Sequence, residues 1–558
     1  YGTNGFYGKF VSGAIGTDSS GQGNTMTVAN LANSDVVIDT PNNNFATLNP
    51  LYTGSVSNTF SEGNLKIVTP STGYGTSTAT IVPTSGKYYA EFKGTTNGDS
   101  GNYGVRDVSM AATNSTWLPD GSTKNMAYQG SNGNIYYNGS SVLSSAPATF
   151  TTNDVIAVAI DYDNSTVKWY KNNSLQYTAT SADLENVTFA GGDSGNSTAV
   201  TAEANFGQKT LAYTPPSGYV ALSTANLPDP AIPLPSAHFN TVLYAGSGSA
   251  QTISGVGFQP DFSWTKCRSA ATWHRLVDAV RGSNKEYFSN DAYQEVNSAG
   301  GARAMTFESD GFAWGGDSGD VNGSGRNYVS WNWKANGTGS TDTSGDIDAT
   351  VSANPTSGFS IVKYTATSDP DATVPHGLGV APEMVFYKWG SSAWYCWTTV
   401  IDGSNDRLVL DRDDAKTTVS ATYGSFTSSF IRGIDVSTGV IAYCFASIPN
   451  FSKIGVYTGN NNADGPMILT GFKPAWVMVK RTDGANEWII VDVKRDIDNA
   501  AIHRLFPNLA DAESTSQSPM DILSNGFKLR TSAGICNAAG TYFYMAFAEA
   551  PFKYANAR

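Results

Sequence analysis

Residues 471–480 read Gly-Phe-Lys-Pro-Ala-Trp-Val-Met-Val-Lys, and a Trp and an Asp follow at positions 488 and 492. The same landmarks occur in the same order in two earlier parts of the chain. The three sets are Pro260, Lys266, Trp273 and Asp278; Pro382, Lys388, Trp397 and Asp402; and Pro474, Lys480, Trp488 and Asp492. Several landmarks in one order do not arise by chance, and their uneven spacing excludes a short-period solenoid. The sequence therefore predicts one β-module used three times.

Each repeated Lys ends a short apolar run that reads as a strand. We expect the Asp to pair with the Lys across neighbouring strands and the Trp to fill the core beside them. The expected pairs are Lys266–Asp278, Lys388–Asp402 and Lys480–Asp492. The alternative is a sugar site, in which an exposed Trp stacks on a pyranose face. Repetition fits both interpretations, because weak sites that recur gain avidity.

The composition favours an all-β protein. Gly is abundant (57 of 558 residues), aromatic residues make up 12%, and charged residues only 15%. Clusters of Gly, Asn, Ser and Thr separate short apolar runs, and the best helical candidates, 272–280 and 499–505, are short. No apolar run reaches the roughly 18 residues of a membrane span. We therefore expect no membrane insertion. The net charge of −13 disfavours nucleic acid, so we expect no nucleic-acid partner either.

Acidic loops are the candidates for catalysis or metal binding. Asp310, Asp317 and Asp320 lie in one Gly-rich loop, and a second group runs from Asp402 to Asp414. A glycosidase needs two carboxylates about 5–9.5 Å apart, but acidic residues in such loops mostly build turns. We therefore expect no catalytic site and no cofactor, with loop calcium as the alternative. The four cysteines are too sparse for a disulfide scaffold and are expected to be buried free thiols.

Turn and linker signals divide the chain into seven parts. The predicted parts are 1–58, the end of an upstream β module (with a strand at 1–10) plus an extended linker; 59–228, a β-sandwich; 229–235, a Pro-rich linker; 236–336, repeat module 1; 337–354, a Gly/Ser/Thr linker; 355–450, repeat module 2; and 451–558, repeat module 3. Because no linker separates the last two modules, we expect them to pack together.

Residues 59–228 resemble the SPRY domain, a concanavalin-like β-sandwich. The resemblance rests on Gly86-Lys-Tyr-Tyr89, on a hairpin over 154–171, and on Asn205-Phe-Gly207. The sequence departs from the family at Asn172-Asn173, where the family has Asn-Gly. The predicted fold is an all-β chain with this sandwich followed by three β-sandwich-like repeat modules.

The segments around the sandwich extend the resemblance. Asp39-Thr-Pro41 to Pro50, then the sandwich, then Tyr213-Thr-Pro-Pro216 and a closing Met545-Ala-Phe547 occur in the order found in tail-fibre or virion-surface proteins of tailed bacteriophages, especially marine ones. The resemblance implies a virion-surface location, other virion proteins as partners, and attachment to a host surface glycan or receptor. Fibres are commonly trimeric, so we expect a homo-oligomer with a trimer favoured.

Aromatic loops are the candidates for ligand contact. Trp389, Trp394 and Trp397 cluster around a Gly-Ser-Ser turn, and Trp314, Tyr136 and Tyr137 are further candidates. The sequence thus predicts a non-enzymatic tail fibre or spike. The alternatives are a capsid decoration protein, a polysaccharide-degrading spike and, less favoured, a cellular surface adhesin.

Overall fold

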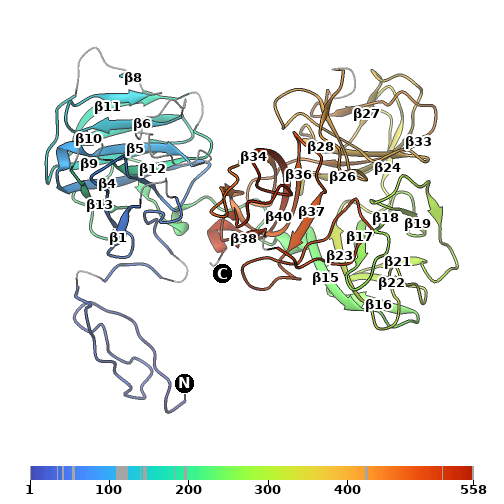
Figure 1. Ribbon diagram of the computed structural model, residues 1–558, viewed down its shortest axis with the longest axis horizontal. Helices are drawn as coiled ribbons and strands as arrows, with labels where there is room; N and C mark the ends of the chain where they lie inside the picture. The colour runs from blue at the N-terminus through green and yellow to red at the C-terminus, as the bar shows by residue number, and fades with distance from the viewer. Residues whose placement is uncertain are drawn as a thin grey trace. The chain divides into compact units, whose positions relative to one another are not determined.

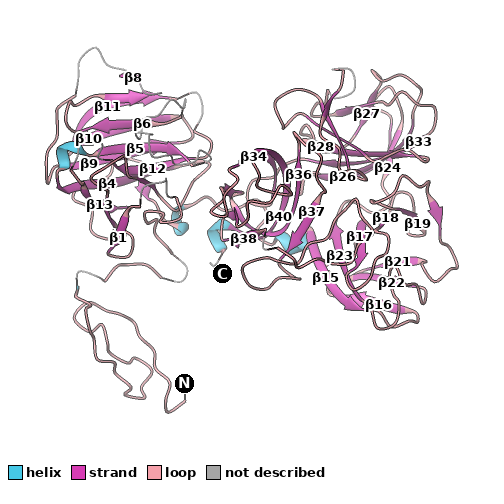
Figure 2. Cartoon of the chain, viewed as in Figure 1, coloured by secondary structure: helices cyan, strands magenta, loops and turns pink. Residues whose placement is uncertain are grey.

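The computed structural model describes residues 2–33, 36–40, 43–52, 57–108, 124–137, 140–141, 147–181, 184–193, 198–420, 425–517 and 519–555. Strands dominate these ranges, joined by turns and by four short 3-10 helices, η2 (Gly98–Ser100), η3 (Thr224–Asn226), η4 (Pro235–Ala237) and η6 (Phe552–Tyr554) (Figure 2). Within the same ranges no helix is long and apolar enough to cross a membrane. The chain divides into two compact units, Tyr1–Pro228 and Asp229–Arg558 (Figure 1). The predicted all-β class is confirmed.

The first unit is a sandwich of two sheets. The larger sheet has the order β1 (Thr59–Ser61), β2 (Lys66–Val68), β13 (Thr201–Asn205), β4 (Lys87–Thr96), β9 (Val155–Asp161), β10 (Thr166–Lys171) and β11 (Ser174–Thr180), with β14 (Val220–Ala221) parallel to β4. The smaller sheet has the order β3 (Thr76–Thr78), β12 (Val187–Gly192), β5 (Asn102–Asp107), β6 (Met126–Gln129), β7 (Ile135–Tyr137) and β8 (Ser140–Ser141). Phe92 of β4 stacks on Tyr103 of β5 with ring centroids 5.3 Å apart. Trp169 of β10 donates from Nε1 to the Tyr103 carbonyl at 3.0 Å, so aromatic contacts join the two sheets.

The hairpin predicted for residues 154–171 is confirmed, because β9 and β10 pair antiparallel around it. The next turn joins β10 to β11 through Asn172 and Asn173, whose φ angles are 45° and 69°. A two-residue turn with positive φ at both positions is type I′. Asn tolerates this left-handed region better than other non-Gly residues. The departure from Asn-Gly therefore preserves the turn.

Residues 43–52 belong to the sandwich and do not form the predicted extended linker. Phe45, Ala46 and Leu48 are buried, and the Ala46 N–H donates to the Leu222 carbonyl at 2.9 Å. The linker prediction is wrong here because these apolar side chains gain more by covering the sandwich than by staying in water.

The strand predicted at the start of the chain is also absent from the described part of residues 1–33. Isolated bridges such as Gly8–Asp18 and Val11–Ala14 take its place. Asp18 organises this segment by accepting hydrogen bonds from the backbone N–H groups of Tyr7, Ser20 and Asn24. The segment is thus held by turns and not by a sheet.

The second unit contains three repeats, each with a large and a small antiparallel sheet (Figure 1, green, ochre and red). Repeat 1 has β15 (Phe239–Ala245), β23 (Asn327–Trp333), β17 (Phe262–Cys267), β18 (Arg275–Asp278), β19 (Lys285–Tyr287) and β20 (Val296–Asn297), then β16 (Gln251–Ser254), β22 (Gly311–Trp314) and β21 (Met305–Glu308). Repeat 2 has β24 (Ser340–Asp342), β25 (Ala349–Asn354), β26 (Phe359–Thr365), β33 (Gly439–Phe445), β28 (Met384–Trp389), β29 (Tyr395–Thr398), β30 (Asp406–Val409) and β31 (Thr417–Thr418), then β27 (Thr373–Pro375) and β32 (Phe430–Arg432). Repeat 3 has β34 (Ser452–Gly459), β40 (Gly540–Pro551), β36 (Phe472–Arg481) and β37 (Ile489–Asp492), then β35 (Met467–Leu469), β39 (Gly526–Leu529) and β38 (Met520–Leu523).

Four strands occupy the same places in every large sheet. The orders are β15-β23-β17-β18, β26-β33-β28-β29 and β34-β40-β36-β37. In each, the third strand carries the repeated lysine and pairs with the long closing strand. The register pairs are Lys266 with Val329, Lys388 with Ile441 and Lys480 with Phe543. The expected equivalence of the three lysines is confirmed by this register.

Each large sheet is buried on both faces. One face packs on the small sheet of its own repeat and forms a separate core in each repeat. The opposite faces of the three large sheets meet in a single shared core, rich in aromatic side chains such as Trp331, Tyr443 and Phe543. All three repeats therefore pack together, which extends the prediction made for the last two.

Two predicted linkers are parts of the packed structure. Residues 337–354 contain β24 and β25, which add to the large sheet of repeat 2. In the Pro-rich segment, Ile232 is buried in the shared core. Of the two helical candidates, 272–280 contains β18 and 499–505 contains isolated bridges, because pairing with neighbouring strands overrides local propensity.

Candidate functional site

The three repeated lysines form bonds between repeats. Each side chain is fully buried, and its Nζ donates to backbone carbonyls. The acceptors across repeat boundaries are Ala510 for Lys266 (3.2 Å), Ala292 for Lys388 (3.0 Å) and Asp413 for Lys480 (3.0 Å). Burial lowers the pKa of each lysine to about 8, because a dry environment disfavours the ammonium. Repeat 1 thus bonds to repeat 3, repeat 3 to repeat 2, and repeat 2 to repeat 1, which closes a ring.

Two tryptophans make a second set of bonds in this ring. Trp394 donates from Nε1 to the Phe288 carbonyl of repeat 1 at 2.7 Å. Trp488 donates in the same way to the Val409 carbonyl of repeat 2 at 2.9 Å. Each of these carbonyls lies four residues before the one that accepts from the lysine of the same repeat. A lysine and a tryptophan therefore hold the same loop of the neighbouring repeat at two points.

Repeat 1 has His274 where the other repeats have this tryptophan. Backbone N–H groups fix the alignment, since His274 donates to Asn290 (2.8 Å), Trp394 to Asp411 (2.8 Å) and Trp488 to Asn508 (3.1 Å), all at side-chain Oδ1. His274 is fully buried, and its Nδ1 accepts from Trp264 Nε1 at 2.9 Å. Burial holds the pKa of His274 well below 6.5, so its imidazole is neutral. Trp273, which we expected in the core, lies one position earlier and is 38% exposed, because successive residues of an extended chain face opposite sides.

The predicted Lys–Asp pairs are wrong. Asp278 forms an ion pair with Arg281 at 2.5 Å and accepts from the Tyr443 hydroxyl of repeat 2 at 2.7 Å. Asp492 forms the same pair with Arg495, three residues later. Both aspartates lie at the far end of the neighbouring strand, and their lysines donate to backbone carbonyls instead. The aspartates are thus buried joints of the ring, held by a nearby arginine.

Repeat 2 lacks this aspartate, and the contacts between neighbouring repeats explain its absence. Asp492 accepts from Trp331 Nε1 of repeat 1 at 2.9 Å. The position of Trp331 in repeat 3 is Met545, whose side chain has no N–H or O–H to donate. The residue that corresponds to Asp492 in repeat 2 is Thr398, and the arginine position is the buried Ile401. Repeat 3 thus offers no side-chain donor at this joint, and repeat 2 has no carboxylate there. A buried carboxylate without a partner would be costly.

The aromatic residues predicted to contact a ligand are mostly buried. Trp394 is fully buried, Trp397 is 5% exposed and Trp314 is 1% exposed. Trp389 is half-buried and packs on Tyr395 with ring centroids 5.3 Å apart. Trp394 lies in the core shared between repeats, whereas Trp397 and Trp389 pack on the core of repeat 2 itself. The prediction that Trp394 and Trp397 contact a ligand is therefore wrong, because both rings are buried.

Tyr136 and Tyr137 lie half-buried in β7 of the first unit. The Tyr136 hydroxyl accepts from the side-chain amides of Asn132 (2.8 Å) and Asn134 (3.2 Å). These contacts stabilise the turn before β7.

The acidic loops also build local structure. Asp310 accepts from the backbone N–H groups of Gly255 and Gly257, and Asp402 pairs at the surface with Lys416. Asp406 is fully buried and accepts from Lys416 at 2.9 Å. Across the described ranges there is no group of three or more His, Cys, Asp or Glu that could hold a metal ion. The four cysteines are buried free thiols, as predicted.

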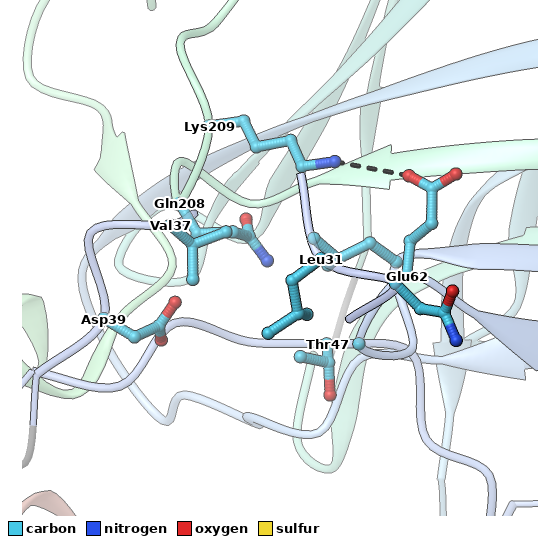
Figure 3. Close-up of a pocket in the computed structure, with 10 residues that line it drawn as sticks. Leu31, Val37, Asp39, Thr47, Glu62, Gln208 and Lys209 are labelled. Atoms are coloured by element: carbon cyan, nitrogen blue, oxygen red, sulfur yellow. Dashed lines mark hydrogen bonds and ion pairs between the residues drawn. The ribbon is translucent and has the colours of Figure 1, made fainter. Parts of the chain in front are cut away.

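A cleft of about 420 Å³ lies at the edge of the larger sheet in the first unit (Figure 3). Leu31, Val37 and Leu65 give it apolar walls, and Asp39 and Gln208 add polar groups. The other lining residues are Asn30, Thr47, Glu62, Gly63 and Lys209. Cavities that combine apolar walls with a few polar groups are the usual form of ligand sites.

Lys209 and Glu62 form an ion pair at the rim of this cleft, with Nζ and Oε2 3.4 Å apart (Figure 3). Both side chains are more than one-third exposed, so the pair contributes only about 0–1 kcal/mol and can be exchanged for a ligand at little cost. The same two residues and Leu65 also border a second hollow of about 220 Å³, which contains Glu91 and Glu203. The two hollows share Glu62, Leu65 and Lys209 as lining residues, and we call the two hollows together the groove.

Glu91 in the second hollow is held in place by the backbone. It is 5% exposed and accepts from the N–H groups of Ala212 at 2.7 Å and Tyr213 at 2.9 Å. No sequence motif marks this groove. Its residues come from distant segments, and the only local signal is the apolar run Val36-Val-Ile38 in a polar stretch.

These features define an all-β protein that joins a SPRY sandwich to a closed unit of three repeats. The SPRY domain model matches residues 93–193. The model of a domain of unknown function (DUF7483) matches residues 234–551, more than half of the chain, and the chain belongs to this family. Its extent includes all three repeats in one domain.

Two solved structures are similar to a part of the chain. The SPRY domain of human HERC1 is 19% identical and covers 29% of this chain and 99% of its own, with a TM-score of 0.26. The PSpry domain of TRIM65 is 11% identical and covers 29% of this chain and 90% of its own, with a TM-score of 0.24. No curated protein matches the chain.

Proposed function

We propose that the protein is a non-enzymatic virion-surface protein of a tailed bacteriophage, a tail fibre or spike that attaches to the host surface. The order of the segments around the sandwich supports the phage assignment. The closed ring supports the structural role and is the observation that carries the proposal. Its recurring lysines and tryptophans bond to neighbouring repeats, so the most regular feature of the sequence serves internal assembly. A ring of this kind suits a rigid support for a ligand-binding surface.

The groove in the first unit is the proposed contact for host glycan or protein. Its apolar walls and its exchangeable Lys209–Glu62 pair suit a ligand with both apolar and polar parts. Site-directed change at this pair alters the groove with little effect on folding, because both side chains are partly exposed.

Residues 2–33 support the proposal of a homo-oligomer. They carry one Lys and one Asp, whereas the chain as a whole has a net charge of −13. Their exposed apolar side chains include Phe6, Phe10 and Val11, each about half exposed. Copies of a near-neutral apolar segment can associate without the repulsion that the rest of the chain would bring.

The proposal is tested by adsorption of the purified full chain to host cells and to extracted surface polysaccharide. The expected result is saturable binding, with the polysaccharide unchanged in length after prolonged incubation. If the protein binds saturably to none of the host fractions, the attachment function is contradicted and a capsid decoration protein is favoured.

A polysaccharide-degrading spike is the second candidate, and one observation favours it. Glu62, Glu91 and Glu203 line the same hollow, and paired carboxylates are the usual groups for glycoside hydrolysis. Release of oligosaccharides that stops on Glu203→Gln would establish this function in place of simple attachment.

A further inference from the structure

The three repeats provide an internal comparison that separates structural residues from the rest. His274, Trp394 and Trp488 occupy equivalent positions in the three repeats. The residue before this position is Trp273 in repeat 1, and Ala393 and Glu487 in the other two. The backbone N–H of His274, Trp394 or Trp488 donates to the side chain of Asn290, Asp411 or Asn508. Three residues after this acceptor stands Tyr293 in repeat 1, and Asp414 and Asp511 in the other two. The ring therefore closes without an aromatic residue at either place. The aromatic pair of repeat 1 needs a different explanation.

Trp273 and Tyr293 form a fixed aromatic surface. Their side chains are 38% and 49% exposed, and their ring centroids lie 6.2 Å apart with 40° between the planes. Both rings rest on the buried Phe288, at centroid distances of 4.8 Å and 6.3 Å. The Arg275 guanidinium lies 4.4 Å from the centre of the Phe288 ring, which fixes the support from within. The two rings thus present a tilted, preorganised surface to solvent.

We propose that Trp273 and Tyr293 form a saccharide-binding platform on repeat 1, and that its ligand is an uncharged pyranose chain. The inference rests on the proposed attachment function and specifies its ligand class. The electron-rich face of an aromatic ring attracts the polarised C–H bonds of a pyranose. Asp291 and Gln294 flank Tyr293 in the chain and can hydrogen-bond sugar hydroxyls at the edge.

The size of the platform favours a sugar over a protein. Two rings that are less than half exposed offer on the order of 200 Å² of contact. A stable protein interface buries about 800 Å² per partner, several times more. A single sugar unit has a matching apolar face, and its affinity for such a small surface is weak. Several copies in a homo-oligomer would raise the overall affinity by avidity.

Charge selects among flat ligands. Asp291 lies two residues before Tyr293 of the platform. On the other side, the Thr272 N–H donates to the Ala510 carbonyl, and this bond brings the exposed Asp511 close to Thr272, the neighbour of Trp273. Carboxylates at the rim oppose phosphate-bearing bases and acidic sugars, and the net charge of −13 acts in the same direction. The platform therefore suits neutral sugars.

The platform is tested directly by ¹⁹F NMR of full-length protein labelled with 5-fluorotryptophan. Trp273→Phe assigns the Trp273 resonance, and maltohexaose, cellohexaose and chitohexaose serve as neutral probes. We expect at least one probe to shift the Trp273 resonance and to leave those of the buried Trp394 and Trp488 in place. If no neutral probe shifts it, or if the buried residues shift equally, the platform is refuted.

Adsorption to host cells separates this inference from the proposed function. Trp273→Ala should lower binding about tenfold or more, while Tyr554→Ala, a control with a similarly exposed ring (51%), should leave it unchanged. If the wild type binds and Trp273→Ala binds equally well, the platform is wrong and attachment stands. If the wild type does not bind, attachment fails, and the NMR titration still decides whether the platform takes sugar.

Discussion

Replacement of Lys480 by Met removes one of the three lysine joints of the ring. Its Nζ donates to the carbonyls of Asp413 at 3.0 Å and Arg481 at 2.8 Å. Two hydrogen bonds from a charged donor are worth roughly 3–6 kcal/mol. Burial of the ammonium, seen in the fall of its pKa from 10.5 to about 8, costs about 3 kcal/mol at neutral pH. The net destabilisation expected for Lys480→Met at pH 7 is therefore about 0–3 kcal/mol.

The destabilisation by Lys480→Met should grow as the pH rises. Below pH 8 the lysine is protonated in both the folded and the unfolded states, so it adds no pH dependence. Between about 8 and 10.5 the folded lysine has lost its proton and the unfolded one keeps it. The unfolded state then binds more protons, so this group stabilises the fold as the pH increases. From pH 7 to 9.5 the difference between wild type and variant should increase by about 2 kcal/mol.

The assay is guanidinium unfolding of the full chain followed by tryptophan fluorescence, at pH 7 and pH 9.5. The difference between the two proteins is the quantity of interest, because buried groups such as Cys444, whose pKa is raised to about 12, lower the stability of both at high pH. Lys363→Met, at an exposed position of β26, is the matched control and should show no such growth with pH. A difference for Lys480→Met that stays constant or shrinks with pH would refute the assignment of a buried lysine joint.

Three further substitutions test other parts of the structure. Asp278→Ala removes the nearer of two carboxylates from the buried Arg281 guanidinium, leaving Glu295 at 3.5 Å, and takes the acceptor from the Tyr443 hydroxyl; it should destabilise the second unit by about 3–5 kcal/mol in thermal unfolding. A loss below about 1 kcal/mol would mean that the pair is not a joint. Trp394→Phe keeps an aromatic side chain, although a smaller one, and removes the N–H bond to the Phe288 carbonyl of the neighbouring repeat. The expected loss is at least about 1–3 kcal/mol in the same measurement, and an unchanged melting temperature would contradict it. Lys209→Glu places two carboxylates at the cleft rim; it should change stability by less than about 1 kcal/mol but reduce adsorption to host cells, and equal adsorption would exclude the cleft as a contact.

The sequence predicts the repeat and its strand register well. Each lysine ends a short apolar run before a turn, and these local signals place Lys266, Lys388 and Lys480 on equivalent strands. The partners of these lysines were not predictable in this way. They are backbone carbonyls of another repeat, and a carbonyl has no signature in the sequence.

Two errors arise from single-residue details. Trp273 follows the motif at almost the same distance as the other tryptophans, yet His274 takes the core position and the tryptophan faces solvent. Asp402 stands near the expected place of the repeated aspartate, but Thr398 occupies it. Repeat 3 supplies Met545 at the position of Trp331, and a methionine side chain has no hydrogen to donate to a carboxylate. Both cases depend on the neighbouring repeat, so local spacing could not resolve them.

Composition misled the prediction for residues 337–354. Gly, Ser and Thr suggested a linker, but Ala349, Val351 and Ala353 alternate and form β25 beside β26. The alternation was weak because alanine gives little contrast with polar neighbours. Tertiary pairing completes the strand.

Reconstruction of the intact virion by cryo-electron microscopy, with this chain located in the map, tests the proposed function most directly. We expect copies of the chain on the outer surface of the tail fibre or spike, associated as a homo-oligomer, with the groove or the Trp273 platform facing outward. Location in the interior of the particle, or absence from it, would contradict the proposed function.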